Sequence, residues 1–363
     1  MLKVFHIISQ FDLGGAERVA LNIASSDNAN IEYHLVELIH SKGNFSKNFV
    51  DEIKSYDIQF HRFYIPSIKF HYVFERFAAL IFPLWFFFIF RKHQPNVIHC
   101  HTEIPDLAVY YFFRLYPKLL KKCKIIRTIH NTKLWTGMER TGKKVEHFFK
   151  KNHANIAISK SVQQSYFNTY GENPRIIYNG IKETSQQQYP IIKSGTKNVL
   201  FAGRFEKQKG ISTLIKIIKK LEHESTYYFY IFGAGSLENE INRELAGCRN
   251  VEINPPLFGI SKYMKSFDYM IMPSEHEGLS IISIEASING LPLIINNCPG
   301  LKDTLPKDWP LKVEDNNIEE YVNIFLHKLY EFSTEDLCTK SKAFVTNKFG
   351  IVQMQKNYEN LYV

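Results

Sequence analysis

The sequence predicts an α/β protein of two domains, each built on a parallel sheet with helices on both faces. Three observations lead to this prediction. The chain has 363 residues, which is more than a single hydrophobic core usually organises. Apolar residues make up 45% and charged residues 22%, so the chain has enough apolar material to fold and does not have the composition of a disordered protein. Apolar segments of strand length alternate with helical patterns, which is typical of parallel sheets.

The strands and helices follow one another in the same way in both halves of the chain. In the first half, strands are expected at residues 3–9, 32–39, 58–65, 96–101, 124–130, 155–159 and 175–179, with helical patterns such as 16–26 and 105–116. In the second half, strands are expected at 198–203, 227–233, 251–254, 269–273 and 291–295, with helices at 212–224, 236–246 and 280–290. The polar segment 185–197 separates the halves. We therefore expect two Rossmann-like domains, 1–185 and 186–345, that face a cleft lined by strand ends.

One segment, FAALIFPLWFFFIF at residues 77–90, is strongly apolar. It is an uncharged run of fourteen residues that contains Pro83, whereas a membrane span needs about 20 apolar residues. We expect a buried helix that packs on a sheet. The alternative is a helix at a membrane surface, with its aromatic face in the interface.

Charge and cysteine content narrow the class of protein. The formal net charge of +9 favours an anionic partner, such as a nucleotide, a phospholipid surface or nucleic acid. Nucleic acid is the least expected of these partners, because no platform of interleaved aromatic and basic residues is present. The five cysteines form no C-x-x-C pair, and the N-terminus resembles a first strand more than a signal peptide. These features predict a cytoplasmic protein.

Two glycine-bearing turns follow predicted strands. Gly14 and Gly15 open a helix after the first strand, so that backbone amide groups there could approach a phosphate. The loop GRFEKQKG in the second half carries Gly203, Arg204 and Lys209. Its two cations are placed to neutralise a diphosphate as the bond between that diphosphate and a sugar breaks. A solvated basic turn is the alternative interpretation of this loop.

The segment PSEHEGLSIISIEASING places Glu277 and Glu285 eight residues apart. In one continuous helix these side chains would lie about 80° apart and ~12 Å apart along the axis, so an acid/base pair is not expected. We expect Glu277 in a loop, a helix from about Ser280 to Gly290, and Glu285 a little over one turn inside it. The amide groups at the helix start belong to Gly278, Leu279 and Ser280. They suit a nucleotide-sugar diphosphate, with the sugar at Glu277 and the ribose at Glu285.

These segments together resemble a known family. GGAERV, GRFEKQKG, YNGI and PSEHEGLSIISIEASINGLPLI occur in this order over nearly the whole chain, and they are similar to family 4 of the retaining glycosyltransferases, which have the GT-B fold. Arg204 and Lys209 match the R-x4-K pair of that family, and Glu277 and Glu285 match its E-x7-E motif. The resemblance implies that the two cations bind the donor β-phosphate and stabilise the departing nucleoside diphosphate. It assigns the donor sugar to Glu277 and the ribose to Glu285.

The resemblance also implies roles outside the second half. The Gly14–Gly15 turn would close over the donor, and His130, at the end of a predicted strand, would face the sugar near its reacting carbon. A closing helix, residues 346–363, would return to pack on the N-terminal domain. The residues expected in that interface are Phe349, Tyr358 and Tyr362.

The segment HCHTE places His99, His101 and Glu103 on one face of an extended stretch, as metal ligands could be. Members of the family use protein cations where other enzymes use a divalent ion, so the resemblance implies no metal and no cofactor. We expect His99 in the core and His101 on the acceptor side. The segment 131–144 is either a mobile basic loop or part of an acceptor-side or membrane-facing surface. Its candidate residues for that surface are Lys133, Trp135 and Arg140.

The predicted function is that of a retaining glycosyltransferase. It would move a sugar from a nucleoside-diphosphate sugar, with uridine diphosphate as the expected nucleotide, to a glycan or lipid-linked acceptor in surface polysaccharide synthesis. Contact with the anionic inner face of the membrane is also expected. Two alternatives remain. A nucleotide-sugar epimerase of similar two-domain build would release an altered nucleotide-sugar without an acceptor. A non-catalytic sugar-binding module would not need a diphosphate clamp.

Overall fold

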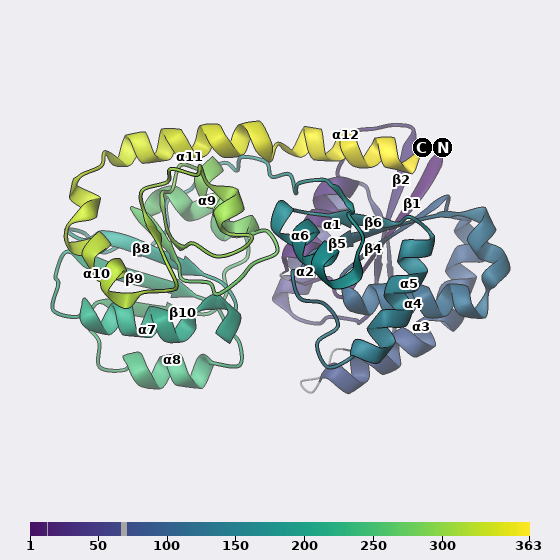
Figure 1. The fold of residues 1–363 in the computed structure, drawn as a ribbon, viewed down its shortest axis with the longest axis horizontal. Coiled ribbons are helices and arrows are strands. Elements are labelled where there is room, and N and C mark those ends of the chain that lie inside the picture. Colours follow the sequence, from purple (N-terminus) through teal and green to yellow (C-terminus); the bar gives the residue numbers. More distant parts are fainter. Residues whose placement is uncertain (13, 67–70) are drawn as a thin grey trace. The chain divides into compact units, whose positions relative to one another are not determined.

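The computed structural model of the protein describes residues 1–12, 14–66 and 71–363. The chain divides into two compact units, residues 1–180 with 351–363, and residues 181–350. Each unit contains one parallel sheet flanked by helices, so the predicted α/β class with two Rossmann-like domains is confirmed (Figure 1). The division falls at Gly180, a few residues before the boundary expected at residue 185.

Unit 1 contains a seven-stranded sheet in the order β3-β2-β1-β4-β5-β6-β7, with all neighbouring strands parallel. Its strands are β1 (Leu2–Ile8), β2 (Ile31–Glu37), β3 (Gln59–Arg62), β4 (Val97–His101), β5 (Lys124–Ile129), β6 (Asn155–Ala157) and β7 (Arg175–Ile176). Its helices are α1 (Gly15–Ala24), α2 (Asn44–Ser55), α3 (His71–His93), α4 (Glu103–Leu115), the 3-10 helix η1 (Pro117–Lys122), α5 (Glu139–Lys151), α6 (Lys160–Tyr170) and α12 (Ile351–Tyr362). The strand order reverses between β1 and β4, the position at which open α/β sheets bind ligands.

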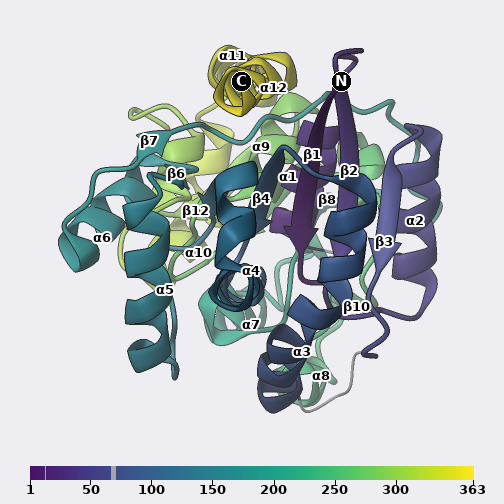
Figure 2. The same ribbon diagram turned by 90° about the vertical axis from the view of Figure 1, so that its right-hand side faces the viewer.

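Alternate residues of β1 point to opposite faces of this sheet. Phe5 belongs to a core cluster with residues of α3, α4 and α5, and its ring meets that of Phe86 in α3 edge to face. His6 points the other way and lies 6.3 Å, ring centre to ring centre, from Tyr362 of α12. Helices α3, α4 and α5 therefore cover one face of the sheet, and α12 lies with α1 on the other (Figure 2).

Helix α12 ties the end of the chain to unit 1. The hydroxyl of Tyr358 lies 2.9 Å from Thr128 Oγ1, and the hydroxyl of Tyr362 lies 2.9 Å from His99 Nδ1. Both tyrosines are buried, so the expectation that the closing helix packs on the N-terminal domain is confirmed for them. Phe349 was expected in the same interface, and for this residue the expectation stays a prediction. Phe349 is buried within unit 2, where the ammonium of Lys348 lies 5.1 Å from its ring centre.

The apolar segment 77–90 lies inside α3, a helix of 23 residues that continues through Pro83. The prediction of a buried helix is right for one face only. Ala78, Phe82 and Phe86 are completely buried, whereas the opposite face is exposed. Within the described residues, no helix combines the length and the apolar character that are needed to cross a membrane.

Unit 2 contains a six-stranded parallel sheet in the order β10-β9-β8-β11-β12-β13. Its strands are β8 (Lys197–Ala202), β9 (Tyr227–Phe232), β10 (Val251–Asn254), β11 (Tyr269–Met272), β12 (Leu293–Asn296) and β13 (Lys312–Val313). Its helices are the 3-10 helix η2 (Lys207–Lys209), α7 (Ile211–Lys220), α8 (Glu238–Leu245), the 3-10 helix η3 (Ile260–Ser266), α9 (Ile281–Ile288), the 3-10 helix η4 (Lys302–Thr304), α10 (Ile318–Leu326), the 3-10 helix η5 (Lys328–Tyr330) and α11 (Thr334–Lys348). The strand order reverses between β8 and β11, so the loops after these strands flank the expected ligand position.

Candidate functional site

The loop after β8 carries the two predicted cations and is held by close backbone packing. Gly203 donates a backbone hydrogen bond to Phe232 at 3.0 Å. A Cβ atom on Gly233 would lie only 2.1 Å from the carbonyl oxygen of Gly203, so the glycine lets the two loops touch. Phe205 is buried in the core, and the Arg204 side chain before it is exposed. The fold therefore fixes the backbone of this loop and presents the guanidinium group to solvent.

Gly210 brings this loop against the loop after β11. Its φ of 69° lies in the left-handed region, and a Cβ atom there would lie 1.8 Å from the carbonyl oxygen of Pro273. Gln208 strengthens the contact between the two loops. Its side-chain amide donates to the backbone carbonyl of His276 at 3.0 Å, and its backbone carbonyl accepts from the backbone amide of Glu275 at 2.8 Å. No residue other than glycine fits at position 210 without moving one of the loops.

This contact places Lys209 next to Glu277. Lys209 Nζ lies 2.6 Å from Glu277 Oε1, and the two side chains are 18% and 7% exposed. The hydroxyl of Ser274 donates to the same carboxylate oxygen at 2.8 Å. The amide of Glu277 donates to the carbonyl of Pro299 at 2.9 Å, which holds the loop against the chain that follows β12. Lys209 and Glu277, which were predicted site residues from two distant motifs, thus form one ion pair, and this pair is reachable mainly from the lysine side.

Helix α9 begins directly after this loop. The predicted boundaries are confirmed: Ser280 is the N-cap, Ile281 is the first helical residue, and Gly290, with a φ of 77°, follows the last turn. The side chain of Ser280 makes no capping bond, and its Oγ atom is buried with no hydrogen-bond partner among the described residues. The first amide groups of a helix lack intrahelical acceptors and carry partial positive charge. This end of α9 therefore has donors and a polar side chain suited to an anion.

The other predicted donor-site residues of unit 2 lie around the same loops. Gly278 and Leu279 are buried between Glu277 and the start of α9. Glu285 is the fifth residue of α9 and is half-buried, a little over one turn inside the helix as predicted. Arg204 thus lies in the loop after β8, and Glu285 lies in the helix that follows the loop after β11, the two strands between which the strand order reverses.

Residues that sequence reasoning missed hold Glu277 in place. Asn296, the last residue of β12, donates to the carbonyl of Ser274 at 2.9 Å and accepts from the amide of Asn316 at 3.0 Å. The side-chain amide of Asn316 donates in turn to the carbonyl of Pro273 at 2.9 Å. Because these partners are twenty or more residues apart in the sequence, only Ser274, three residues before Glu277, carried a local signal.

In unit 1, the predicted residues also lie at carboxyl ends of strands. Gly14 is the N-cap of α1 and has an extended backbone, and Gly15 is the first residue of that helix, as predicted; residue 13 before them lies outside the described residues. A Cβ atom on Gly14 would lie 2.0 Å from the carboxylate of Glu17, so glycine leaves room for that side chain. His130 follows β5 and is partly exposed.

His130 belongs to a row of imidazoles. Its Nε2 atom lies 3.1 Å from His101 Nδ1, and His101 Nε2 lies 3.0 Å from His6 Nδ1. Burial lowers the pKa of His130 and of His6 to about 3, so both rings are neutral at physiological pH. His101 was expected to line the acceptor side, and this is wrong: its side chain is completely buried behind His130 and holds that ring.

The arrangement of His99, His101 and Glu103 on one face, which was weighed as a metal site and not expected to be one, does not form. Glu103 starts α4 instead of continuing the strand, while His99 is buried in the core as expected. His99 and His101 do approach His6, with one nitrogen of each ring within 4.8 Å of the others. Both nitrogens of His99 are engaged, with Tyr362 and Thr128, so a metal ion at this position would have to replace existing hydrogen bonds. A second group of three histidines whose ring nitrogens lie within 4.8 Å of one another consists of His34, His61 and His93.

Trp135 was expected on an acceptor-side or membrane-facing surface, and this is wrong. The side chain is 2% exposed, and its indole N–H donates to Glu146 at 2.5 Å. Gly142 in α5 makes room for it, because a Cβ atom there would lie 2.3 Å from the indole ring. Arg127 bonds the same carboxylate through both terminal nitrogens, at 2.7 and 2.8 Å, and Asp106 at 2.7 Å. Trp135 thus covers a buried ion network and supports the fold.

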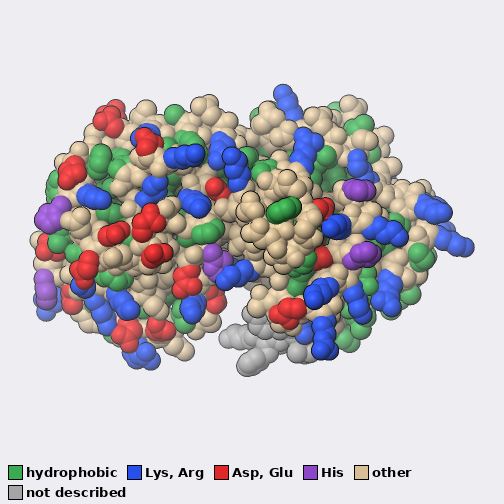
Figure 3. Space-filling view, viewed as in Figure 1, with side chains coloured by type: hydrophobic (Ala, Val, Ile, Leu, Met, Phe, Trp, Pro, Cys, Tyr) green, Lys and Arg blue, Asp and Glu red, His purple; other side chains and the backbone are tan. Residues whose placement is uncertain are grey.

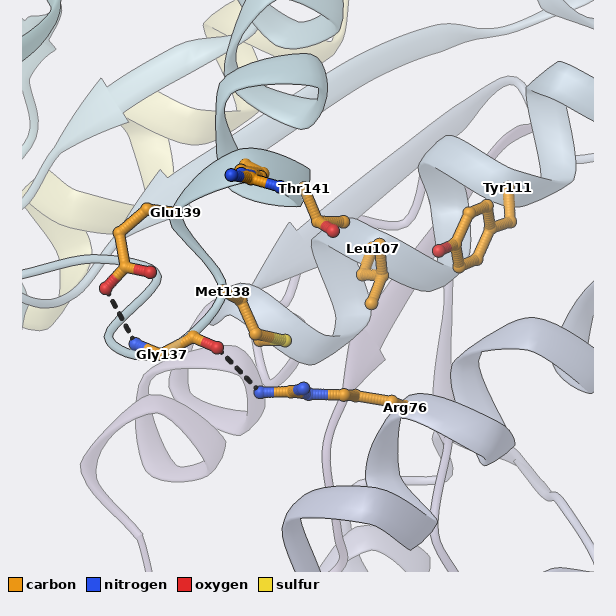
Figure 4. A pocket seen from close by; sticks show the side chains of 8 residues that line it. Arg76, Leu107, Tyr111, Gly137, Met138, Glu139 and Thr141 are labelled. Carbon is orange, nitrogen blue, oxygen red and sulfur yellow. Dashed lines mark hydrogen bonds between the residues drawn. The ribbon is translucent and has the colours of Figure 1, made fainter.

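Lys133 and Arg140 are exposed. Arg140 lines a cavity of about 330 Å³ between α3, α4 and the start of α5. The guanidinium of Arg76 reaches across this cavity from α3 and donates to the carbonyl of Gly137 at 3.0 Å (Figure 4). The pocket therefore has two cationic side chains, of which sequence reasoning found only Arg140. The remaining lining residues include Leu107, Tyr111, Met138 and Thr141.

Comparison with known proteins assigns the class. Residues 13–184 match the model of Glycosyltransferase Family 4, and residues 196–329 match that of Glycosyl transferases group 1, so that together the two models match most of the chain. The chain belongs to the glycosyltransferases of this type. Among its relatives, it is 23% identical over 320 residues to the capsular polysaccharide biosynthesis glycosyltransferase CapH of Staphylococcus aureus, with 82% of each chain covered. It is 24% identical over 304 residues to the O-antigen biosynthesis glycosyltransferase WclY of Escherichia coli, with 74% of this chain and 78% of WclY covered.

Solved structures agree on the fold. Anabaena HepE, in complex with UDP and glucose, superposes with a TM-score of 0.78 at 14% identity and covers 99% of both chains. A mutant of S. aureus TarM, in complex with UDP and glycan ligands, superposes with a TM-score of 0.77 at 14% identity over the full length of both chains. The fold of this protein is therefore GT-B.

Proposed function

We propose that the protein is a retaining glycosyltransferase that uses a nucleoside-diphosphate sugar, with uridine diphosphate as the nucleotide, and no cofactor. One observation carries the donor assignment. Lys209 pairs with Glu277 in the loop that leads into α9, and Ser280, the N-cap of α9, has a buried hydroxyl without a partner among the described residues. A diphosphate supplies acceptor oxygens for that hydroxyl and for the amide groups at the helix start, and its charge attracts Lys209.

In the proposed reaction, the donor pyrophosphate lies at the start of α9, with Lys209 and Arg204 as its cations. The bond between the anomeric carbon and the phosphate oxygen breaks, and the acceptor hydroxyl forms a bond to that carbon on the same face. The proton of the hydroxyl passes to the departing phosphate oxygen. Lys209 and Arg204 stabilise the charge that grows on the leaving diphosphate, where other enzymes use a divalent ion.

Glu277 and Glu285 are assigned to the donor sugar and the ribose. Lys209 and Ser274 both hold Oε1 of Glu277, so Oε2 remains for a sugar hydroxyl. On the side of unit 1, a neutral His130 can exchange one hydrogen bond with the sugar, since His101 already holds its Nε2 atom. The Gly14–Gly15 turn is proposed to approach the donor through its backbone.

The acceptor is proposed to be a glycan or lipid-linked glycan in surface polysaccharide synthesis. The support for this is the likeness to CapH and WclY, whose names refer to capsular polysaccharide and O-antigen. The exposed cations Lys133 and Arg140 are the candidates for the acceptor side in unit 1.

The test is to incubate the protein with a panel of nucleotide-sugars, without an acceptor, and to follow products by NMR spectroscopy from the start of the reaction, because this method separates epimers and anomers of equal mass. We expect slow hydrolysis of one donor, which releases a free sugar of retained configuration and a nucleoside diphosphate. An altered nucleotide-sugar with no release of nucleotide would instead identify an epimerase. Binding of sugar without binding of uridine diphosphate at millimolar concentration would identify a non-catalytic module.

A further inference from the structure

Helix α3 exposes a long apolar face. Its large side chains on that face have relative exposures of 43% for Phe74, 51% for Phe77, 58% for Leu80, 55% for Leu84 and 71% for Phe88. Isolated exposed apolar residues are common on protein surfaces, whereas a continuous row of this length is not. We call these five residues the α3 apolar face.

The spacing of these residues makes one stripe. At 100° per residue they fall within an arc of about 120°, and at 1.5 Å per residue the stripe is about 21 Å long. Phe82 and Phe86, on the opposite side of the helix, are completely buried against the sheet. The exposed stripe is thus not needed to hold α3 in unit 1. Leu115 at the end of α4, 53% exposed, extends it sideways, because Phe87 of α3 stacks on the neighbouring Tyr116.

Cations border one end of the α3 apolar face. Helix α3 ends with the exposed Arg91 and Lys92, and it leads directly into β4. The 3-10 helix η1 leads into β5, the parallel neighbour of β4, so both helices end at the same edge of the sheet. The exposed cations of η1 are Lys118, Lys121 and Lys122.

Acidic residues are scarce in the same segments, because α3 carries a single one, Glu75, near its start. Residues 76–102 and 107–138 contain no Asp or Glu. Figure 3 shows Lys and Arg side chains at the right-hand edge of the molecule, in the unit that carries α3 and α4. An apolar stripe bordered by cations, with few acidic residues nearby, is typical of a surface that binds an anionic bilayer.

We propose that the α3 apolar face lies in the headgroup and acyl boundary of an anionic lipid bilayer, with Arg91, Lys92 and the lysines of η1 on the lipid phosphates. We favour a bilayer over a second copy of the chain because lipid phosphates complement the cations at this border. The surface lies in unit 1, whereas the Lys209–Glu277 pair lies in unit 2. Membrane binding therefore goes beyond the proposed reaction and is testable without it.

Trp85 provides an internal probe of this surface. It lies on α3 between Leu84 and Phe86 and is partly exposed, whereas the other two tryptophans, Trp135 and Trp309, are each 2% exposed. Lipids with brominated acyl chains quench tryptophan only at close range. We expect wild-type protein to bind vesicles that contain phosphatidylglycerol and to show quenching of Trp85 by brominated lipid. Vesicles of phosphatidylcholine alone should bind at least about tenfold more weakly.

Three matched variants complete the experiment. In the first, Phe77→Ser, Leu84→Ser and Phe88→Ser together should lower binding to anionic vesicles at least about tenfold. In the second variant, Lys118→Gln, Lys121→Gln and Lys122→Gln together should lower vesicle binding only when the vesicles contain phosphatidylglycerol. The control removes exposed apolar side chains of unit 2 and should bind like wild type. Its substitutions are Ile191→Ser, Tyr330→Ser and Phe332→Ser.

Thermal unfolding and uridine diphosphate binding, measured on each variant, show whether the fold and the donor site are intact. Absence of vesicle binding by the wild-type protein would overturn the proposal. So would equal loss of binding in the unit 2 control and in the α3 variant. A concentration-dependent dimer that the α3 substitutions dissociate, without vesicle binding, would assign the face to a second copy instead.

Discussion

Replacing Lys209 with alanine gives the sharpest test of the donor site. The ammonium of Lys209 lies 2.6 Å from Glu277 Oε1, and in the proposed reaction it also meets the charge on the leaving diphosphate. Alanine removes one preorganised positive group from the transition state. Loss of one such group typically lowers kcat by about 10²–10³, or about 2.7–4 kcal/mol. We expect Lys209→Ala to lose transfer to that extent.

The same substitution should leave the protein folded. Breaking a fully buried ion pair costs about 3–5 kcal/mol, and an exposed pair contributes about 0–1 kcal/mol. Lys209 is 18% exposed, and Glu277 keeps its hydrogen bond from Ser274, so we expect a loss of about 1–2 kcal/mol. For a unit of this size, that loss lowers Tm by only a few degrees.

The assay follows release of nucleoside diphosphate from the donor, with Tm measured on the same samples. Lys207→Ala is the matched control, because Lys207 lies in the same 3-10 helix with an exposed side chain. The Lys207→Ala variant should release nucleoside diphosphate at the wild-type rate. Turnover of Lys209→Ala within threefold of wild type, or an equal loss in both variants, would refute the assignment of Lys209.

Three further predictions concern other parts of the structure. Ser280→Ala should leave Tm unchanged or slightly raised, because the hydroxyl is buried and unpartnered. It should weaken nucleotide binding about tenfold, as measured by calorimetry. An unchanged nucleotide affinity would remove Ser280 from the site. Arg127→Met should cost about 3–5 kcal/mol in urea unfolding, because it leaves two buried carboxylates without their cation, and a loss below 1 kcal/mol would contradict this. Stability should fall as pH drops below 6.5, because an unfolded histidine takes up a proton that folded His6 and His130, each with a pKa lowered to about 3, do not. The loss is up to ~1.4 kcal/mol per pH unit for each ring, and constant stability from pH 7 to 5 would contradict these lowered pKa values.

Local patterns in the sequence were enough to predict the elements and part of the site. The start of α9 at Ser280 and its end before Gly290 follow from helix-stop chemistry that acts within a few residues. Arg204 and Lys209 were placed after a strand because apolar strands and their polar turns are visible locally. The contact of Lys209 with Glu277 depends on the parallel pairing of β8 with β11, which the alternation of strands and helices implies but does not specify.

Other features depend on contacts between distant residues. Trp135 looked like a surface residue within a basic segment, and its burial depends on the space above Gly142 and on the carboxylate of Glu146. Asn296 and Asn316 support the Glu277 loop by hydrogen bonds from their side-chain amides to backbone carbonyls. No local sequence pattern predicts these contacts. The two faces of α3 could not be told apart because apolar residues surround the helix, so periodicity carried no information on exposure.

The central claim is that a pyrophosphate binds where Lys209, Ser280 and the first amide groups of α9 converge. The most direct measurement is a crystal structure of the complex with uridine diphosphate. We predict that the β-phosphate oxygens lie about 3 Å from Lys209 Nζ and from Ser280 Oγ. A nucleotide bound elsewhere, with the Lys209–Glu277 pair undisturbed and Ser280 still without a partner, would contradict the claim.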